Sequence, residues 1–340
     1  MNLSPRASPH PAQWTIARAC PSSWAEDLER CGGGYFHSPA GLLAGAPSGD
    51  PLFLQLWEVD RVVGVGVAVR RPTRWGLDTP RVYLPSVPAV IAHVGSERIS
   101  DDLLAVLAAD GSAVTMDSFD ASRRPDLHAP YTPRMRRNEF IVALDGTAAE
   151  RAARCSAHHR RHLRRGERAG WTLRLLARTE GAPLLRTVLQ TAAERGLLRG
   201  EPFVQGSRDV ALHTVDNVVQ PWGLAIYSVW AANAALGAAV VGYANGRAYY
   251  VAGGSTPEGY EHDASIWLHW RIGTALARAS FLTYNLGGVP ALASDPSHPM
   301  HGLYRFKAGF GSATVECAGM HCPATRAPFY RRWLPHAVNA

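Results

Sequence analysis

The residue whose type most clearly points to chemistry is Lys307. It is the single lysine among 35 basic residues, and all the others are arginines. A composition that replaces lysine with arginine explains why lysine is rare, but not where the last one lies. Lysine carries a compact charge on a flexible stem, and its pKa shifts readily on burial. Lys307 is therefore the first candidate for a catalytic role.

The segment that contains Lys307 has an ordered series of glycines and aromatic residues. A predicted strand ends at Leu286-Gly287-Gly288, a variable loop follows, and the chain then runs Leu303-Tyr304-Arg305-Phe306-Lys307 and Gly309-Phe310-Gly311. Because glycine has no side chain, Gly287 and Gly288 are expected to let the backbone approach a ligand closely. A plain turn after the strand is the alternative.

Several carboxylates and histidines could move a proton in a reaction. Asp117 and Asp120 follow a predicted strand in the first half of the chain, and Asp295, His298 and His301 lie in the variable loop. Each of these residue types is also common in loops and turns. The general base is therefore left open.

One segment carries almost all of the net charge. Residues 151–168 contain seven arginines and one glutamate. We predict a helix here, with a capping box at Thr147 and Glu150 and a stop at Gly170. Helical spacing places five arginines on one face: Arg160, Arg161, Arg164, Arg165 and Arg168. The positive charges of such a stripe repel one another unless anions bind there. Nucleic-acid phosphates, anionic lipid or a phosphorylated substrate are therefore candidate binding partners. A solvated helix face is the alternative.

Composition and cysteine content exclude several classes of protein. With 46% hydrophobic and 19% charged residues, the chain is expected to be globular. The five cysteines are irregularly spaced, so no disulfide framework is expected. No cysteine–histidine set has zinc spacing, and no metal is predicted. The absence of a signal-peptide pattern predicts a cytoplasmic protein.

A long uncharged stretch could be mistaken for a membrane span. Residues 224–244 carry no charge over 21 residues. Asn233 interrupts the stretch, however, and Asn245-Gly246, a hairpin signal, follows it. We therefore predict two buried strands.

The two halves of the chain repeat one order of elements. In residues 52–70 and 225–243, a strand-like run ends at a tryptophan, Trp57 or Trp230, and a glycine follows seven residues later, Gly64 or Gly237. A third strand, a helix and a closing strand come next in each half. The predicted helices are 100–110 and 265–280, the third strands are 81–84 and 247–252, and the closing strands are 113–117 and 282–285.

This order resembles the acetyltransferase (GNAT) fold. The predicted fold class is therefore α+β, with two GNAT-like domains in tandem. Acyl-CoA members place an R/Q-x-x-G-x-G/A loop before the main helix, where backbone N–H groups hold the pyrophosphate. Residues 253–265 lack that pattern and carry Glu258, Glu261 and Asp263. These carboxylates would repel a pyrophosphate.

Residues 284–311 resemble the Fem family most specifically, through the LGG, L-Y-x-F-K and G-F-G motifs quoted above. Family members transfer an amino acid from aminoacyl-tRNA to an amine, usually on a peptidoglycan precursor, and consist of two GNAT-like halves. The resemblance extends to the basic helix, to residues 192–198 and to residues 249–255. Some members carry a coiled-coil arm, which we do not expect near residues 200–220. Residues 36–41 contain no lysine or arginine that could hold a nucleotide-linked cell-wall precursor, which argues against a UDP-linked substrate.

The resemblance implies roles for individual residues. Lys307 would stabilise the oxyanion or the leaving ribose oxygen, and Phe306 would stack on the terminal adenine or position the lysine. The substrate-binding residues would be Tyr304, Arg305, Gly287, Gly288, Tyr250, Asp117 and Asp120. The arginines of the basic helix would bind phosphates of the tRNA acceptor stem.

We expect a first GNAT-like domain over residues 1–146 and a second over residues 147–317, with residues 318–340 returning to the first. The predicted activity is aminoacyl transfer to an amine on a secondary-metabolite precursor or a cell-wall peptide. No cofactor is expected beyond aminoacyl-tRNA as co-substrate, and no stable insertion into a membrane. An acyl-CoA-dependent N-acyltransferase is the alternative, and a non-catalytic binder of RNA or membrane is a third class.

Overall fold

The computed structural model describes residues 12–45, 49–71, 80–91, 96–109, 111–120, 132–198 and 223–323. In the first half, the strands are β1 (Gln13–Ala17), β2 (Asp50–Glu58), β3 (Arg61–Arg71), β4 (Arg81–Leu84), β5 (Ala89–Val90) and β6 (Ala113–Met116). The helical segments of this half are α1 (Trp24–Arg30), η1 (Tyr35–His37), α2 (Pro39–Gly45) and α3 (Ser96–Leu107).

The second half repeats this arrangement. Its strands are β8 (Thr172–Leu176), β9 (Gly223–Ala231), β10 (Ala234–Ala244), β11 (Arg247–Ser255) and β12 (Thr283–Pro290). Its helical segments are α4 (Ala148–Arg154), α5 (Ala157–Arg168), α6 (Arg178–Leu198), α8 (Pro257–Glu261), α9 (Ala264–Arg278), η2 (Ala291–Ser294) and α10 (His301–Ala308). Two long strands lie between the halves, β7 (Thr132–Ala143) and β13 (Ala313–Cys322).

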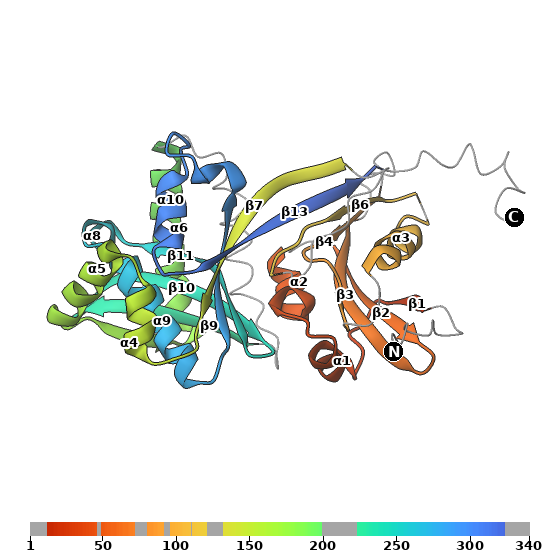
Figure 1. Ribbon diagram of the computed structural model, residues 1–340, viewed down its shortest axis with the longest axis horizontal. Helices are drawn as coiled ribbons and strands as arrows, with labels where there is room; N and C mark the ends of the chain where they lie inside the picture. Colours follow the sequence, from red (N-terminus) through yellow and green to blue (C-terminus); the bar gives the residue numbers. More distant parts are fainter. Residues whose placement is uncertain are drawn as a thin grey trace, which may run out of the picture.

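The described strands form one mixed sheet that runs through both halves. Their order is β1-β2-β3-β4-β6-β13-β7-β12-β11-β10-β9-β8, and β5 pairs with β3. Figure 1 shows the two halves side by side along the long axis of the molecule, with β7 and β13 crossing between them. Each half has an antiparallel meander followed by a helix and a parallel strand, since β4 pairs with β6 and β11 with β12 in parallel. The predicted α+β architecture of two GNAT-like units is confirmed.

The sequence repeat corresponds to a repeat in strand register. In the first half the pairing of β2 with β3 shifts by one residue next to Trp57, and in the second the pairing of β9 with β10 shifts next to Trp230. Such bulges bend a strand and increase its twist. A Cβ on Gly64 would lie 2.8 Å from Val90, and one on Gly237 would lie 2.8 Å from the carbonyl oxygen of Gly254. Both glycines therefore occupy places where another strand passes close by.

The two crossing strands are exchanged between the halves. Strand β7 follows the first half in sequence but pairs with β12, whereas β13 follows the second half but pairs with β6 through residues 320–322. The two strands also pair with each other. The last described residues of the chain thus lie on the first half. The domain boundaries proposed from the sequence stay a prediction, and residues 324–340 lie outside the described residues, as do residues 200–220.

The uncharged stretch of residues 224–244 forms a buried hairpin, β9 and β10, as predicted. Ile226 and Val240 pack against α6 on one face, whereas Val229 and Val241 belong to the core that contains α9 on the other. A strand covered on both faces is apolar along its whole length, because both sets of alternating side chains are buried. Among the described residues, no helix is long and apolar enough to cross a membrane.

The basic segment forms two helices, not the single helix predicted. The capping box is present: Thr147 Oγ1 accepts from the Glu150 amide, and the Glu150 carboxylate accepts from the Thr147 amide. The break comes at Ser156, which has an extended backbone and accepts from the His159 amide, and so starts α5. The Ser156 amide donates to the carbonyl of Gly309. A contact with a distant segment therefore sets the break.

Candidate active site

Strands β11 and β12 pair over a short stretch and then separate. Their parallel register joins Arg247 to Thr283, Ala248 to Tyr284, and Tyr249 to Asn285. Beyond these residues β11 remains paired with β10, while β12 pairs with β7. Ligands of open α/β sheets bind beyond the carboxyl ends of strands at such a switch point. The separation therefore marks a candidate site.

The glycine pair lies where the strands separate. The pairing of β12 with β7 shifts between Asn285 and Gly288, which leaves a bulge that contains Gly287. Gly287 has a φ of +73°, a conformation that glycine adopts without strain. A Cβ on Gly288 would lie 2.8 Å from Cδ of Arg137. Gly287 is thus required by its backbone conformation, and Gly288 by the close packing of Arg137.

Lys307 points from α10 toward the same bulge. Its side chain is buried, with 5% of the residue exposed, and Nζ donates to the carbonyl oxygen of Gly288 at 3.0 Å. Burial lowers the pKa of Lys307 to about 7; Glu139 acts in the opposite direction, and Arg137 lowers it further. Near neutral pH this amine therefore exists in both charge states, which suits a group that exchanges or donates protons during a reaction.

The presence of one lysine in the chain makes its titration directly measurable. In protein labelled with ε-carbon-13 lysine, we expect the Lys307 resonance to titrate with a midpoint near pH 7 in the folded protein and near pH 10.5 in urea. The pKa is expected to be lower in the folded protein because burial disfavours the charged form of the amine. The unfolded sample is the internal control. A folded-state midpoint equal to the unfolded one would contradict the buried environment.

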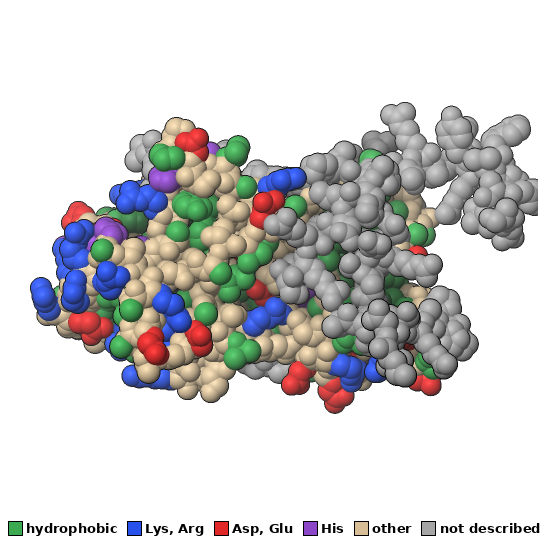
Figure 2. Space-filling model, in the orientation of Figure 1, with side chains coloured by type: hydrophobic (Ala, Val, Ile, Leu, Met, Phe, Trp, Pro, Cys, Tyr) green, Lys and Arg blue, Asp and Glu red, His purple; other side chains and the backbone are tan. Residues whose placement is uncertain are grey.

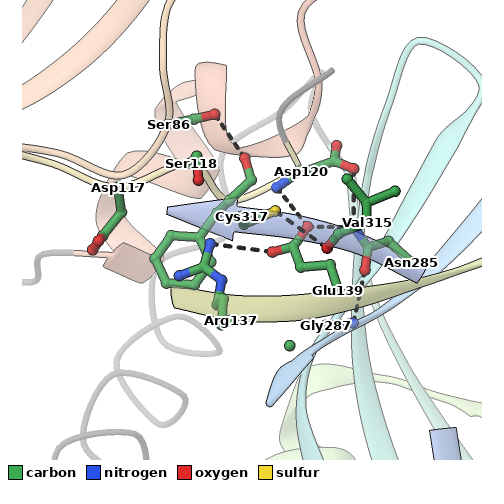
Figure 3. A network of polar contacts seen from close by, with 12 residues as sticks. Ser86, Asp117, Ser118, Asp120, Arg137, Glu139, Asn285, Gly287, Val315 and Cys317 are labelled. Carbon is green, nitrogen blue, oxygen red and sulfur yellow. Dashed lines mark hydrogen bonds and ion pairs between the residues drawn. The ribbon is translucent and has the colours of Figure 1, made fainter. Parts of the chain in front are cut away.

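A buried glutamate, Glu139, is the centre of a polar network near Lys307. Figure 3 shows this glutamate with Arg137, Asp120 and Asn285. Glu139, on β7, is 1% exposed. Its carboxylate lies 3.2 Å from the guanidinium of Arg137 and accepts from Asn285 Nδ2 at 2.9 Å, from Tyr249 Oη at 3.3 Å and from the amide of Asp120 at 3.0 Å. These partners come from β7, β12, β11 and the turn after β6. Glu139 therefore ties the two halves of the molecule together.

Asp120 brings a second carboxylate to this network from the first half. It has a φ of +51° and is 8% exposed, and Asn285 Nδ2 donates to its Oδ1 at 3.3 Å. Burial raises the pKa of Asp120 to about 6, and Glu139 adds to the rise, while Arg247 and the Asn285 hydrogen bond oppose it. This carboxyl group can therefore take up or release a proton close to neutral pH.

Aromatic rings from both halves enclose one side of the network. The guanidinium of Arg137 lies 3.5 Å from the centre of the Phe119 ring. Phe119 stacks on Phe36, whose ring meets Tyr249 edge to face. Cations are attracted to aromatic faces, and the attraction grows when water is excluded. The rings thus hold Arg137 beside Glu139.

The structure brings four of the predicted site residues into one region. A Cβ on Gly287 would lie 3.6 Å from Nζ of Lys307, Gly288 accepts the lysine hydrogen bond, and Asp120 is linked to Gly287 through Asn285. The remaining residues make most of their side-chain contacts elsewhere, although the Tyr250 carbonyl oxygen would lie 3.6 Å from a Cβ on Gly287 and Asp117 places negative charge near Arg137. Tyr250 lies edge to face on His269, Tyr304 packs on Phe140, Arg305 is exposed, and Asp117 accepts from Tyr83.

Phe306 packs within an aromatic cluster of the second half. Its ring lies near His159, His269 and Phe310, at centroid distances of 6.1, 5.7 and 5.4 Å. Burial lowers the pKa of His269 to about 3 and that of His159 to about 4, so both are neutral at physiological pH. The base-stacking role of Phe306 stays a prediction.

Sequence reasoning missed the residues that hold the site together: Arg137, Glu139, Tyr249 and Asn285. One available signal was the pair Arg137 and Glu139, two oppositely charged residues two positions apart and therefore on the same face of β7. A charged pair inside a strand is unusual, since buried charges need partners. Asn285 stands directly before the Leu286-Gly287-Gly288 motif and could have been included with it.

The arginines of α5 lie on the surface, away from this network. Figure 2 shows basic side chains gathered at this end of the molecule, with histidines among them. Arg164 and Arg168 are exposed, Arg161 donates to His158, and Arg165 donates to His262. Arg160 is half-buried and donates to the carbonyl of Cys155. It therefore caps α4 in addition to facing the surface.

Comparison with known proteins supports the resemblance noted in the sequence. Residues 229–331 match the model of the FemAB family. The structure of FemX matches with a TM-score of 0.66 and 13% identity, over 94% of this chain and 99% of the FemX chain. A conserved protein of unknown function from Bacteroides thetaiotaomicron matches with a TM-score of 0.55 and 11% identity, over 91% of this chain and 99% of that one. The search of curated proteins found no match to this chain.

The family match covers the candidate site in part. It includes β11, β12 and α10, and therefore Lys307, Gly287, Gly288 and Asn285. Glu139 and Asp120 lie outside the matched residues. At these identities the structural matches show a shared fold.

Proposed function

We propose, from the match of residues 229–331 to the FemAB family, that this protein transfers an amino acid from aminoacyl-tRNA to an amine and forms an amide bond. The observation that carries the proposal is the position of Lys307. The single lysine is buried in the matched segment, with its amine on the Gly288 carbonyl where β11 and β12 separate. The acceptor is an amine on a secondary-metabolite precursor or a cell-wall peptide.

The reaction requires a hydrogen-bond donor beside the carbonyl oxygen of the ester. The acceptor nitrogen attacks the carbonyl carbon, a C–N bond forms, and the bond to the ribose oxygen breaks. The nitrogen loses one proton and the ribose oxygen gains one, so no proton is consumed overall. Negative charge develops on the carbonyl oxygen in between, and a preorganised donor stabilises that charge most effectively where water is excluded. The ammonium form of Lys307 is the proposed donor.

Asp120 and the arginines of α5 have separate roles in the proposal. Asp120 would take one proton from the acceptor's ammonium group before the attack, since it is the carboxylate whose pKa lies near 6 in the network, and the neutral amine that remains is the nucleophile. Arg161, Arg164, Arg165 and Arg168 would meet phosphates of the acceptor stem, which gives affinity without sequence readout. The ester is already activated, so the reaction requires no further cofactor. Such an enzyme would act in the cytoplasm, where charged tRNA is present.

The direct test is transfer of a labelled amino acid. The protein is incubated with radiolabelled aminoacyl-tRNA pools and a candidate amine, with and without ribonuclease, and a parallel reaction contains labelled acetyl-CoA instead. We expect a labelled amide that forms from aminoacyl-tRNA and disappears when ribonuclease is added first. Product that survives ribonuclease, or product from acetyl-CoA alone, would contradict the proposal and favour an acyl-CoA-dependent enzyme.

A further inference from the structure

Two histidines and one aspartate meet between α5 and the start of α9. They are His158, His162 and Asp263, and one ligand atom of each lies within 4.8 Å of the others. The two histidines are four residues apart on α5, which places them on one helix face, and their ring centroids are 4.4 Å apart. Two histidines at this spacing are a recurrent way for a helix to bind zinc.

His162 has an unsatisfied nitrogen that faces this cluster. The residue is 8% exposed, and its Nδ1 is buried without a hydrogen-bond partner. Oδ2 of Asp263 lies 3.5 Å away, longer than a normal hydrogen bond. A buried polar atom without a partner costs free energy, so such atoms in native proteins call for a specific reason. A bound cation would supply the missing partner.

Asp263 presents its carboxylate to His162 instead of capping its own helix. It occupies the N-cap position of α9 but makes no side-chain cap hydrogen bond, and its φ is +52°. Aspartate at an N-cap normally accepts from the first turn of the helix. The carboxylate is half exposed, which leaves it accessible to ions from solvent.

We propose that His158, His162 and Asp263 bind one divalent cation of the zinc class, with water completing the coordination. Imidazole nitrogens and carboxylate oxygens suit this class, and three protein ligands with an open position are common for zinc. The cation would bridge α5 and α9. It would also add positive charge to the helix that carries the arginines, so the site does not depend on the proposed transfer activity.

Arg161 competes with the cation for one ligand. Its Nη2 lies 3.1 Å from Nδ1 of His158. Arg161 and Arg165 also place positive charge near His162, and Asp263 places negative charge there. Because the guanidinium must leave His158 and repels the ion, Arg161→Gln is expected to tighten binding. A purely structural histidine pair would not respond in this way.

The test is a zinc titration of the metal-free full chain in a Cys20→Ser background, which removes the exposed thiol. Binding is followed by isothermal calorimetry and by competition with a chromophoric chelator. We expect one zinc equivalent that binds at least about tenfold more weakly in His162→Gln and in Asp263→Asn. His301→Gln, on α10, is the matched control and should bind like the parent. Circular dichroism confirms that each variant is folded.

Three outcomes would overturn the proposal. Zinc that binds the His162→Gln variant as tightly as the parent would place it elsewhere. An equal loss of zinc affinity in the His301→Gln variant would indicate that zinc binds surface histidines in general. The absence of any binding in the Arg161→Gln variant would show that the three ligands do not form a site even without the competing guanidinium.

Discussion

Replacing Lys307 with arginine is expected to lower the turnover number for aminoacyl transfer by about 100-fold or more while the protein stays folded. One oxyanion donor is worth about 10²–10³ in turnover in other enzymes. Arginine keeps the positive charge but spreads it over a planar group that cannot take the position of a compact amine. The site has little room for the larger group, because Lys307 is 5% exposed and lies near Arg137.

Steady-state kinetics with saturating acceptor measure this effect. If the lysine acts on the transition state, turnover and kcat/KM should fall together. Arg278→Lys, at the exposed end of α9, is the reverse exchange at a remote position and should leave turnover unchanged. Circular dichroism and thermal unfolding check the fold of both variants. Near-wild-type turnover in Lys307→Arg would show that positive charge alone is sufficient at this position.

Replacing Glu139 with alanine is expected to lower the free energy of unfolding by about 3–5 kcal/mol, the cost of breaking a buried ion pair from one side. The carboxylate is the common partner of Arg137, Tyr249 and Asn285 and of the Asp120 amide. Its removal leaves a buried guanidinium and buried donors without partners. Because those partners come from both halves, the loss should weaken the association of the halves as well as each fold.

Urea denaturation followed by tryptophan fluorescence measures this loss. Glu316→Ala is the control, since Glu316 lies on the adjacent strand β13 and pairs at 3.6 Å with Arg136, whose side chain is 65% exposed. An exposed pair contributes about 0–1 kcal/mol. Equal destabilisation by the two substitutions would indicate that the Glu139 network is not important for holding the sheet together.

Local patterns were sufficient to predict the three meander strands, the following helix and the closing strand of each half. The runs that end at Trp57 and Trp230 are mostly apolar, as buried strands are, and the glycine seven residues later lies next to a bulge in both halves. These features depend on neighbours within one hairpin, so they are visible in sequence. The segment of Lys307 was found in the same way, since its motif is continuous along the chain.

Features that depend on distant contacts were not predictable. The basic segment breaks at Ser156 because its amide donates to Gly309, more than 150 residues away. Glu139 and Asn285 become partners only when β7 and β12 pair. No periodicity in the sequence reports such a pairing, because the partner lies on another element.

The sequence by itself therefore determined the two similar halves, the buried hairpin at residues 224–244 and the segment that carries the single lysine. The tertiary structure alone decided how β7 and β13 are exchanged, which brings Glu139 and Arg137 of β7 near Lys307, and how Asp263 comes to face His162. The reason is physical. Hairpins and helices form from contacts between near neighbours, whereas the pKa of a buried amine, or a set of metal ligands, depends on charges that the fold brings together from far apart in the chain.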